Sequence, residues 1–275
     1  MTDFRPSRFQ ILPLIIKNLL IINGLVWLAQ ITFHSSYGEW INDTFALHSF
    51  QSSLFKPHQL ITYMFMHDDR GFAHLFTNMF ALWMFGSTLE NYWGPKKFLT
   101  FYLLCGIGAA LAHLGVLYYE NAGLINELDA FKKNPELPNF IGLYNKYGLQ
   151  NYDPIPEFVR QWNNNPSSYN PGQAVTFFRE YTDIRFSGTT VGASGSVFGI
   201  LAAFGYTFPN SLIYLYFFFP MKAKWFVIIY AAIELFAGIQ NSAGDNVAHF
   251  AHLGGAVVGL LLVYIWNKAD RRNFY

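Results

Sequence analysis

The stretch at residues 191–199 reads VGASGSVFG, in which two serines lie among three glycines. A run of apolar residues follows and ends before Pro209. Glycine permits sharp turns and close approach of backbones, and the first turn of a helix leaves backbone N–H groups without partners. We therefore expect Ser194 to begin a short helix whose free N–H groups suit a developing oxyanion.

The composition around this stretch indicates a membrane protein. Of the 275 residues, 52% are hydrophobic and only 13% are charged, whereas soluble domains carry about a quarter of charged residues. A net charge of +1 offers no attraction to nucleic acid. The single cysteine, Cys105, excludes an internal disulfide and a multi-cysteine metal site. The lipid bilayer is the expected surrounding, and no cofactor is expected.

Six apolar segments predict an all-α polytopic membrane protein with six transmembrane helices. A spanning helix needs about 20 residues, or fewer if it begins below the membrane surface. The stretch LIYLYFFF at 212–219 is too short to span, and we expect it to lie at the interface or to extend a neighbouring helix. The predicted spans are 14–33, 74–93, 98–119, 194–208, 224–240 and 246–266.

Basic residues near the ends of these segments predict their orientation. If all six segments span, four basic clusters fall on one side of the membrane, so we expect that side and both chain termini to be cytoplasmic. No small-residue cleavage site follows the first apolar run, which predicts a retained span rather than a signal peptide. The clusters are Arg5, Arg8 and Lys17; Lys96 and Lys97; Lys222 and Lys224; and Lys268, Arg271 and Arg272.

A long polar segment at 120–190 separates the third span from the fourth. It is rich in Asn, Pro and Tyr, and the charge pattern predicts that it is extracytoplasmic. Parts of it, at 123–133, 156–162 and 174–184, are typical of amphipathic helices. We interpret it as an insertion within a single membrane domain covering 1–275. It is expected to cap the site, gate substrate entry or bind a partner; the alternative is an inert surface elaboration.

Four polar residues lie toward the non-cytoplasmic ends of three predicted spans. His74 opens the second span, and Asn78 shares its helix face four residues later. Ser194 opens the fourth span, and His252 lies six residues into the sixth. Polar side chains inside a bilayer usually face the bundle interior or water. These side chains are therefore expected to converge in a functional site.

Four motifs in this order carry a resemblance to the rhomboid family of intramembrane serine proteases. Either GxSG or GxxxG alone is a weak signal, but their joint occurrence on the expected helices is specific. The similarity extends from about residue 58 to residue 266, interrupted by the polar segment. The motifs are HxxxN (His74, Asn78), GxxxExxxG (Gly86, Glu90, Gly94), GxSG (Gly192, Ser194, Gly195) and AHxxGxxxG (Ala251, His252, Gly255, Gly259).

The resemblance implies a Ser–His dyad that cleaves transmembrane segments of single-span membrane-protein substrates. Ser194 is expected to be the nucleophile, and His252 the general base that later protonates the leaving amine. The N–H of Ser194 with the side chains of His74 and Asn78 is expected to stabilise the oxyanion. Nothing in the resemblance requires a third, acidic member.

The resemblance also implies supporting roles around the dyad. Phe198, one turn after Ser194, is expected to pack on the imidazole of His252. Glu90 is too far from His74 along its helix for chemistry, and its implied role is structural, near the cytoplasmic end. The six-span layout resembles that of bacterial members, which predicts a bacterial inner (cytoplasmic) membrane.

Individual residues in and near this site also have other interpretations. Ser196 is a rival nucleophile or a small packing residue. His249 and His252 form an HxxH pair, but no HExxH sequence and no evident third ligand accompany them, so no metal is expected. The sequence His67-Asp68-Asp69 is expected to be a solvated loop.

Two other functions are open. A non-catalytic rhomboid-like protein that binds or escorts membrane clients is expected to lose the nucleophile or the base, and this chain has both. A small transporter or channel is expected to place its polar residues near the bilayer midplane, perhaps on broken helices. Here the polar residues cluster near one surface, and no internal repeat is evident.

Overall fold

The computed structural model of the chain describes residues 9–69, 71–215, 218–240 and 248–272, with the side chains of 215 and 269–272 left aside. Arg5, Arg8, the predicted loop 241–245 and the side chains of Arg271 and Arg272 thus lie outside the described parts. The chain forms two compact units. Unit 1 comprises Met1–Leu47, Lys56–Gly115 and Thr189–Tyr275, and unit 2 comprises His48–Phe55 and Val116–Gly188.

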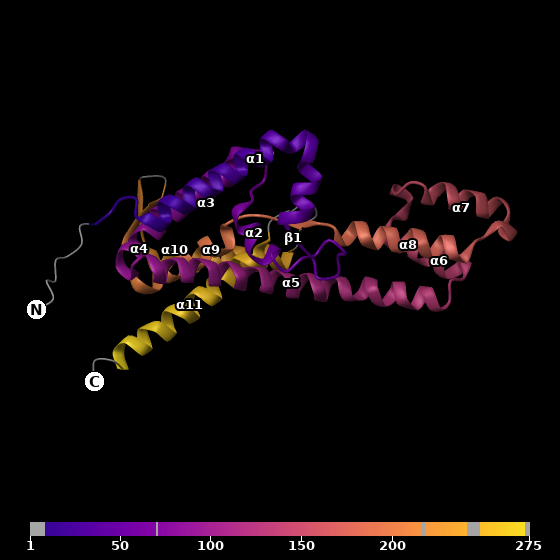
Figure 1. Cartoon of the computed structure of the whole chain (residues 1–275). Coiled ribbons are helices and arrows are strands. Elements are labelled where there is room, and N and C mark those ends of the chain that lie inside the picture. The colour runs from indigo at the N-terminus through magenta and orange to yellow at the C-terminus, as the bar shows by residue number, and fades with distance from the viewer. Residues whose placement is uncertain (1–8, 70, 216–217, 241–247, 273–275) are drawn as a thin grey trace, which may run out of the picture. The chain divides into compact units, whose positions relative to one another are not determined.

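Unit 1 is a set of apolar helices (Figure 1). Within the described residues, four helices are long and apolar enough to cross a membrane: Leu14–Phe45, Pro95–Lys133, Ala223–Gln240 and His249–Lys268. Large apolar side chains such as Ile228, Phe236 and Leu261 are exposed on these helices, which fits contact with lipid rather than water. The elements are α1 (Leu14–Phe45), α2 (Gln59–Thr62), η1 (Tyr63–Phe65), α3 (Phe72–Ala81), η2 (Leu82–Gly86), α4 (Ser87–Trp93), the first part of α5 (Pro95–Lys133), α9 (Ser194–Thr207), α10 (Ala223–Gln240) and α11 (His249–Arg272).

The predicted segments and the observed helices differ mainly at their ends. The first and third segments were expected to end near 33 and 119, but α1 continues to Phe45 and α5 to Lys133. Hydropathy marks only the apolar part of a helix, and polar residues continue both helices beyond it. The second segment is helical in three consecutive pieces, α3, the π-helical turn η2 and α4. Helix α11 begins at His249, so His252 lies in its first turn.

The expectation that 212–219 extends a helix is wrong, although the chain is mostly helical, as expected. Strands β3 (Leu212–Leu215) and β4 (Phe219–Lys222) form an antiparallel pair, with Leu212 opposite Lys222. Pro209 and Pro220 cannot donate helical hydrogen bonds, and the aromatic residues between them favour strands. Two further short strands, β1 (Leu47–His48) and β2 (Thr189–Thr190), complete the described β structure.

Unit 2 is helical and has its own core, which explains how a polar segment of this length stays ordered. All three predicted amphipathic stretches lie in helices. Aromatic side chains fill the core: Trp162 and Tyr169 stack with ring centroids 4.6 Å apart, and Phe140 and Phe178 are fully buried. Besides the second part of α5, the helices are α6 (Leu137–Tyr147), η3 (Leu149–Asn151), α7 (Ile155–Asn164), η4 (Pro166–Ser168) and α8 (Pro171–Phe186).

A buried carboxylate on α4 holds the start of α1. The side chain of Glu90 is 3% exposed, and its two oxygens accept the backbone N–H groups of Ile15 and Ile16, each at 2.9 Å. These N–H groups belong to the first turn of α1, where no intrahelical partner exists and negative charge is favoured. Glu90 therefore joins two helices through their backbone.

Replacing Glu90 by Gln is expected to destabilise the protein. The amide offers one acceptor oxygen instead of two, so one buried N–H group loses its partner at a cost of about 1–3 kcal/mol. The measurement is the melting temperature of the purified protein in detergent, with Glu39→Gln on the exposed surface of α1 as the control. Equal melting temperatures for Glu90→Gln and wild type would contradict this role.

Candidate active site

The candidate site begins at the turn that enters α9. Gly192 has φ 131°, a conformation that residues with a Cβ rarely adopt, and its N–H donates to the carbonyl of Tyr63 at 3.0 Å. A Cβ on Gly192 would lie 3.0 Å from Nε2 of His74. Ser194 is the first residue of the helix. The turn therefore requires glycine, and it brings the helix start beside His74.

Ser194 and His252 are in direct contact. Oγ of Ser194 lies 2.8 Å from Nε2 of His252, and both side chains are partly buried. The ring of Phe198 stacks on the imidazole with centroids 4.3 Å apart and an interplanar angle of 4°. The imidazole is thus fixed on one face by an aromatic ring and at one edge by the serine.

Glycines allow α9 and α11 to approach closely enough for this contact. A Cβ on Gly255 would lie 1.9 Å from the carbonyl oxygen of Gly195, and one on Gly259 would lie 2.6 Å from that of Gly199. Two GxxxG sequences therefore face each other, which is a known mode of helix packing in membranes. Gly195, Gly255 and Gly259 belong to the predicted motifs. Gly199 does not, although its spacing from Gly195 was a visible signal.

The tautomer of His74 follows from its neighbour in the preceding loop. The backbone N–H of Asp68 donates to Nδ1 of His74 at 3.2 Å. Because Nδ1 accepts this bond, a neutral His74 carries its proton on Nε2, the atom that faces Gly192. Asn78 is 6% exposed and uses one of its two amide N–H groups on the carbonyl of His74 at 2.8 Å.

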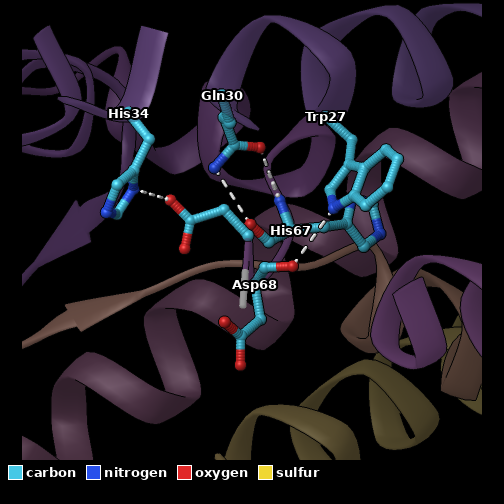
Figure 2. Close-up of polar contacts among 6 residues, drawn as sticks. Trp27, Gln30, His34, His67 and Asp68 are labelled. Atoms are coloured by element: carbon cyan, nitrogen blue, oxygen red, sulfur yellow. Dashed lines mark hydrogen bonds and ion pairs between the residues drawn. The ribbon is translucent and has the colours of Figure 1, made fainter. Parts of the chain in front are cut away.

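The loop that supplies this N–H is fixed to α1 (Figure 2). Gln30 forms a two-way pair with the backbone of His67: its amide donates to the carbonyl at 2.9 Å and its oxygen accepts the N–H at 3.0 Å. The indole N–H of Trp27 donates to the carbonyl of Asp68 at 3.2 Å. Nδ1 of His34 lies 2.6 Å from Oδ2 of Asp69. His67 is only 1% exposed. The expectation of a solvated loop is therefore wrong, because polar side chains of α1 replace water.

Ser196 occupies a different environment from Ser194. It is fully buried, and its hydroxyl donates to the carbonyl of Tyr102 on α5 at 2.8 Å. Its hydroxyl also lies 3.4 Å from the sulfur of Met64. These contacts fit a packing residue between two helices and leave Ser196 without access to a substrate.

An acidic residue that sequence reasoning missed lies beside His252. Oε2 of Glu234, on α10, is 2.8 Å from Nδ1 of His252 and 2.7 Å from Nδ1 of His249. The sequence did carry a signal for this residue: Glu234 is a lone acid in the apolar stretch AAIELFAG at 231–238. Ionisable residues inside membranes are usually functional.

Glu234 also supplies the third possible metal ligand that the HxxH pair was expected to lack. One ligand atom from each of Glu234, His249 and His252 lies within 4.8 Å of the others. Each Nδ1, however, already faces the carboxylate at hydrogen-bond distance, and Nε2 of His252 faces Ser194. A zinc ion would need to lie about 2.0–2.1 Å from each ligating nitrogen. The observed distances between the two Nδ1 atoms and Oε2 of Glu234 are those of hydrogen bonds.

Comparison with known proteins agrees with the motifs of this site. The Rhomboid domain family matches residues 55–124 and 171–269, which is more than half of the chain. The chain belongs to the rhomboid family. The matched residues include Ser194, His252, His74, Asn78 and Glu90.

Three rhomboid relatives are similar over most of this chain. RHOMBOID-like protein 12, mitochondrial, of Arabidopsis thaliana is 25% identical over 85% of this chain and 54% of its own length. Rhomboid protein 1, mitochondrial, of Saccharomyces cerevisiae is 25% identical over 76% and 42%. An uncharacterized mitochondrial rhomboid protein of Schizosaccharomyces pombe is 28% identical over 82% and 56%. The chain spans about half the length of these relatives. All three are named as mitochondrial, so the predicted bacterial inner membrane has no support.

Substituting Gly255 by Ala is expected to separate α9 from α11. The new methyl group would overlap the carbonyl of Gly195, and such overpacking costs about 1–3 kcal/mol or more. The melting temperature in detergent should fall, whereas Gly24→Ala on α1, where a Cβ meets nothing within 4 Å, should not lower it. Equal melting of the two variants would contradict the close packing.

Acidification is expected to destabilise the protein through His67. Burial, reinforced by the neighbouring His74, lowers the pKa of His67 from 6.5 to about 3. Below pH 6.5 the unfolded chain takes up a proton on this histidine, while the folded state keeps the ring neutral. The free energy of unfolding therefore falls as the pH drops from 6.5 toward 3, by up to about 1.4 kcal/mol per pH unit. Melting temperatures between about pH 7 and pH 4.5 should fall less steeply for His67→Phe than for wild type. Parallel curves would contradict this assignment.

Proposed function

We propose that this protein is an intramembrane serine endopeptidase that cleaves transmembrane segments of single-span membrane proteins. The observation that carries the proposal is the 2.8 Å contact between Oγ of Ser194 and Nε2 of His252, at the entrance of a helix in an apolar bundle. A serine hydroxyl is a weak nucleophile by itself, and a neighbouring imidazole activates it.

In the first half of the reaction, Oγ of Ser194 attacks the carbonyl carbon of the scissile peptide bond. The hydroxyl proton passes to Nε2 of His252, and the C=O electron pair moves onto oxygen to form a tetrahedral oxyanion. When this intermediate collapses, the C–N bond breaks and the leaving amine takes the proton from His252. The acyl group then remains on Ser194 as an ester.

Water completes the cycle. His252 removes a proton from water as the water oxygen attacks the ester carbonyl, and a second oxyanion forms. Its collapse breaks the bond to Oγ of Ser194, which regains a proton from His252. The product leaves as a carboxylic acid, and serine and histidine return to their starting states.

Three donors are proposed to stabilise the oxyanion. The backbone N–H of Ser194 belongs to the first turn of α9 and has no intrahelical partner. Neutral His74 carries its proton on the nitrogen that faces the turn, which supports its role as a second donor. Asn78 keeps one amide N–H group beyond the one that it gives to His74. Loss of one such donor typically costs about 10²–10³-fold in rate.

The proposal includes six crossings of the membrane. Four helices are long enough by themselves. The consecutive pieces α3, η2 and α4 form one helical segment and supply the fifth crossing. The sixth is α9, a shorter apolar helix that begins below the membrane surface in this proposal, so that water reaches Ser194. In this layout the segment 120–190 is an extracytoplasmic insertion.

The alternative of a non-catalytic client-binding rhomboid is less well supported. Such a protein has no need for an activated serine. Here Ser194, His252 and the stacked Phe198 keep the geometry that activation requires.

The test is cleavage of a model single-span substrate by the purified protein in liposomes. Wild type should cleave, and the cleavage rates of Ser194→Ala and His252→Ala should fall about 10⁴-fold or more, because the nucleophile and the base of a serine protease act as a unit. Ser196→Ala is the matched control, since Ser196 lies two residues after Ser194 in the same helix, and this variant should retain cleavage. Cleavage that survives Ser194→Ala would contradict the proposal, as would a folded wild type that cleaves none of a panel of substrates.

A further inference from the structure

Glu234 is the one acidic residue of α10, a helix that is apolar apart from it, Lys224 and Gln240. Its side chain is 6% exposed. Among the described residues, its hydrogen bonds and ion pairs are those with His249 and His252, which share the single oxygen Oε2. A carboxylate in an apolar helix is costly and is usually kept only where it has partners and a function.

The contacts of Glu234 fix the proton positions on His252. An ionised carboxylate only accepts hydrogen bonds, so Nδ1 of His252 carries a proton when it faces Oε2. The neutral imidazole then has a bare Nε2, which accepts the hydroxyl proton of Ser194 across 2.8 Å. The opposite tautomer would present an N–H group to the serine and could not act as a base.

We propose that Glu234 is a positioning residue that completes a Ser194–His252–Glu234 relay. This inference rests on the proposed protease function and adds an acidic member that the Ser–His dyad alone does not include. His249 holds the carboxylate from the same helix that carries His252, one turn away. Two N–H donors that converge on one oxygen restrict the carboxylate to the direction of the imidazole.

The relay acts when the charge develops. As the proton of Ser194 reaches Nε2, the imidazole becomes an imidazolium with a proton on each nitrogen. The carboxylate of Glu234 stays ionised and stabilises this cation through the Nδ1–H bond, without taking the proton. On collapse of the tetrahedral intermediate the Nε2 proton passes to the leaving amine, and the neutral Nδ1–H tautomer returns.

The other contacts of the His252 ring leave its Nδ1 edge for an acid. Among the described residues, Glu234 is the acid at that edge. Phe198 covers one face of the ring, and Ser194 occupies Nε2. Tyr230, one turn before Glu234, packs against Phe198 with ring centroids 4.8 Å apart. The Nδ1 edge is therefore the position from which α10 reaches the imidazole.

The experiment compares Glu234→Gln and Glu234→Asp in the full chain, reconstituted in liposomes with the single-span substrate. Glu234→Gln should lower kcat by about 10²–10⁴-fold with KM nearly unchanged, because it perturbs the base and not substrate binding. Glu234→Asp keeps a carboxylate one methylene shorter and should fall between wild type and Glu234→Gln. Glu90→Gln is the matched control: it also removes a buried carboxylate, and the folded fraction should keep the wild-type kcat.

Each outcome separates this inference from the proposed function. If wild type cleaves and Ser194→Ala does not, the protease function stands, and a kcat of Glu234→Gln within about two-fold of wild type would overturn the relay. A Glu234→Gln variant that loses kcat only in proportion to its folded fraction would overturn it as well. If Glu234→Gln does not fold, Glu234→Asp decides alone, since an unchanged kcat would contradict the relay. A wild type that cleaves no substrate would overturn both.

Discussion

The close contact between the backbones of α9 and α11 brings Ser194 and His252 together, and the rest of the site depends on it. At Gly195–Gly255 and Gly199–Gly259 no side chain separates the two helices, and the hypothetical Cβ atoms would overlap carbonyl oxygens. In a bilayer, helices gain little from burying apolar surface against each other, so close packing of small residues carries the association. This approach distance allows a short side chain, that of Ser194, to reach an imidazole on the neighbouring helix.

Buried polar groups are expensive in such a bundle, and two sets of hydrogen bonds connect those of the site. One runs from Ser194 through His252 to Glu234, across three helices. The other runs from α1 through the loop after η1 to His74 and sets its tautomer. Each set fixes which nitrogen of a histidine carries the proton, so one histidine accepts a proton and the other offers one. This difference suits the roles proposed for them in acyl transfer, His252 as the base and His74 as an oxyanion donor.

The sequence indicated the helices, the turn at Ser194 and the convergence of its motif residues, because these depend on short patterns with a local physical cause. It did not indicate the antiparallel pairing of β3 with β4, since a short apolar run fits either a strand or a helix. The burial of His67 was missed because it depends on Gln30, which is distant in sequence. Glu234 was missed because its partner lies on another helix, although a lone acid in an apolar stretch deserved a functional interpretation.

The central claim is that Ser194 is a nucleophile activated by His252. The most direct test treats the protein in liposomes with a fluorophosphonate, which forms a covalent bond with activated serines, and locates the adduct by mass spectrometry of the peptides. We predict a single adduct on Ser194 that is absent in His252→Ala, with Ser196 unmodified. An adduct on another serine, or equal labelling of Ser194 when His252 is removed, would contradict the account.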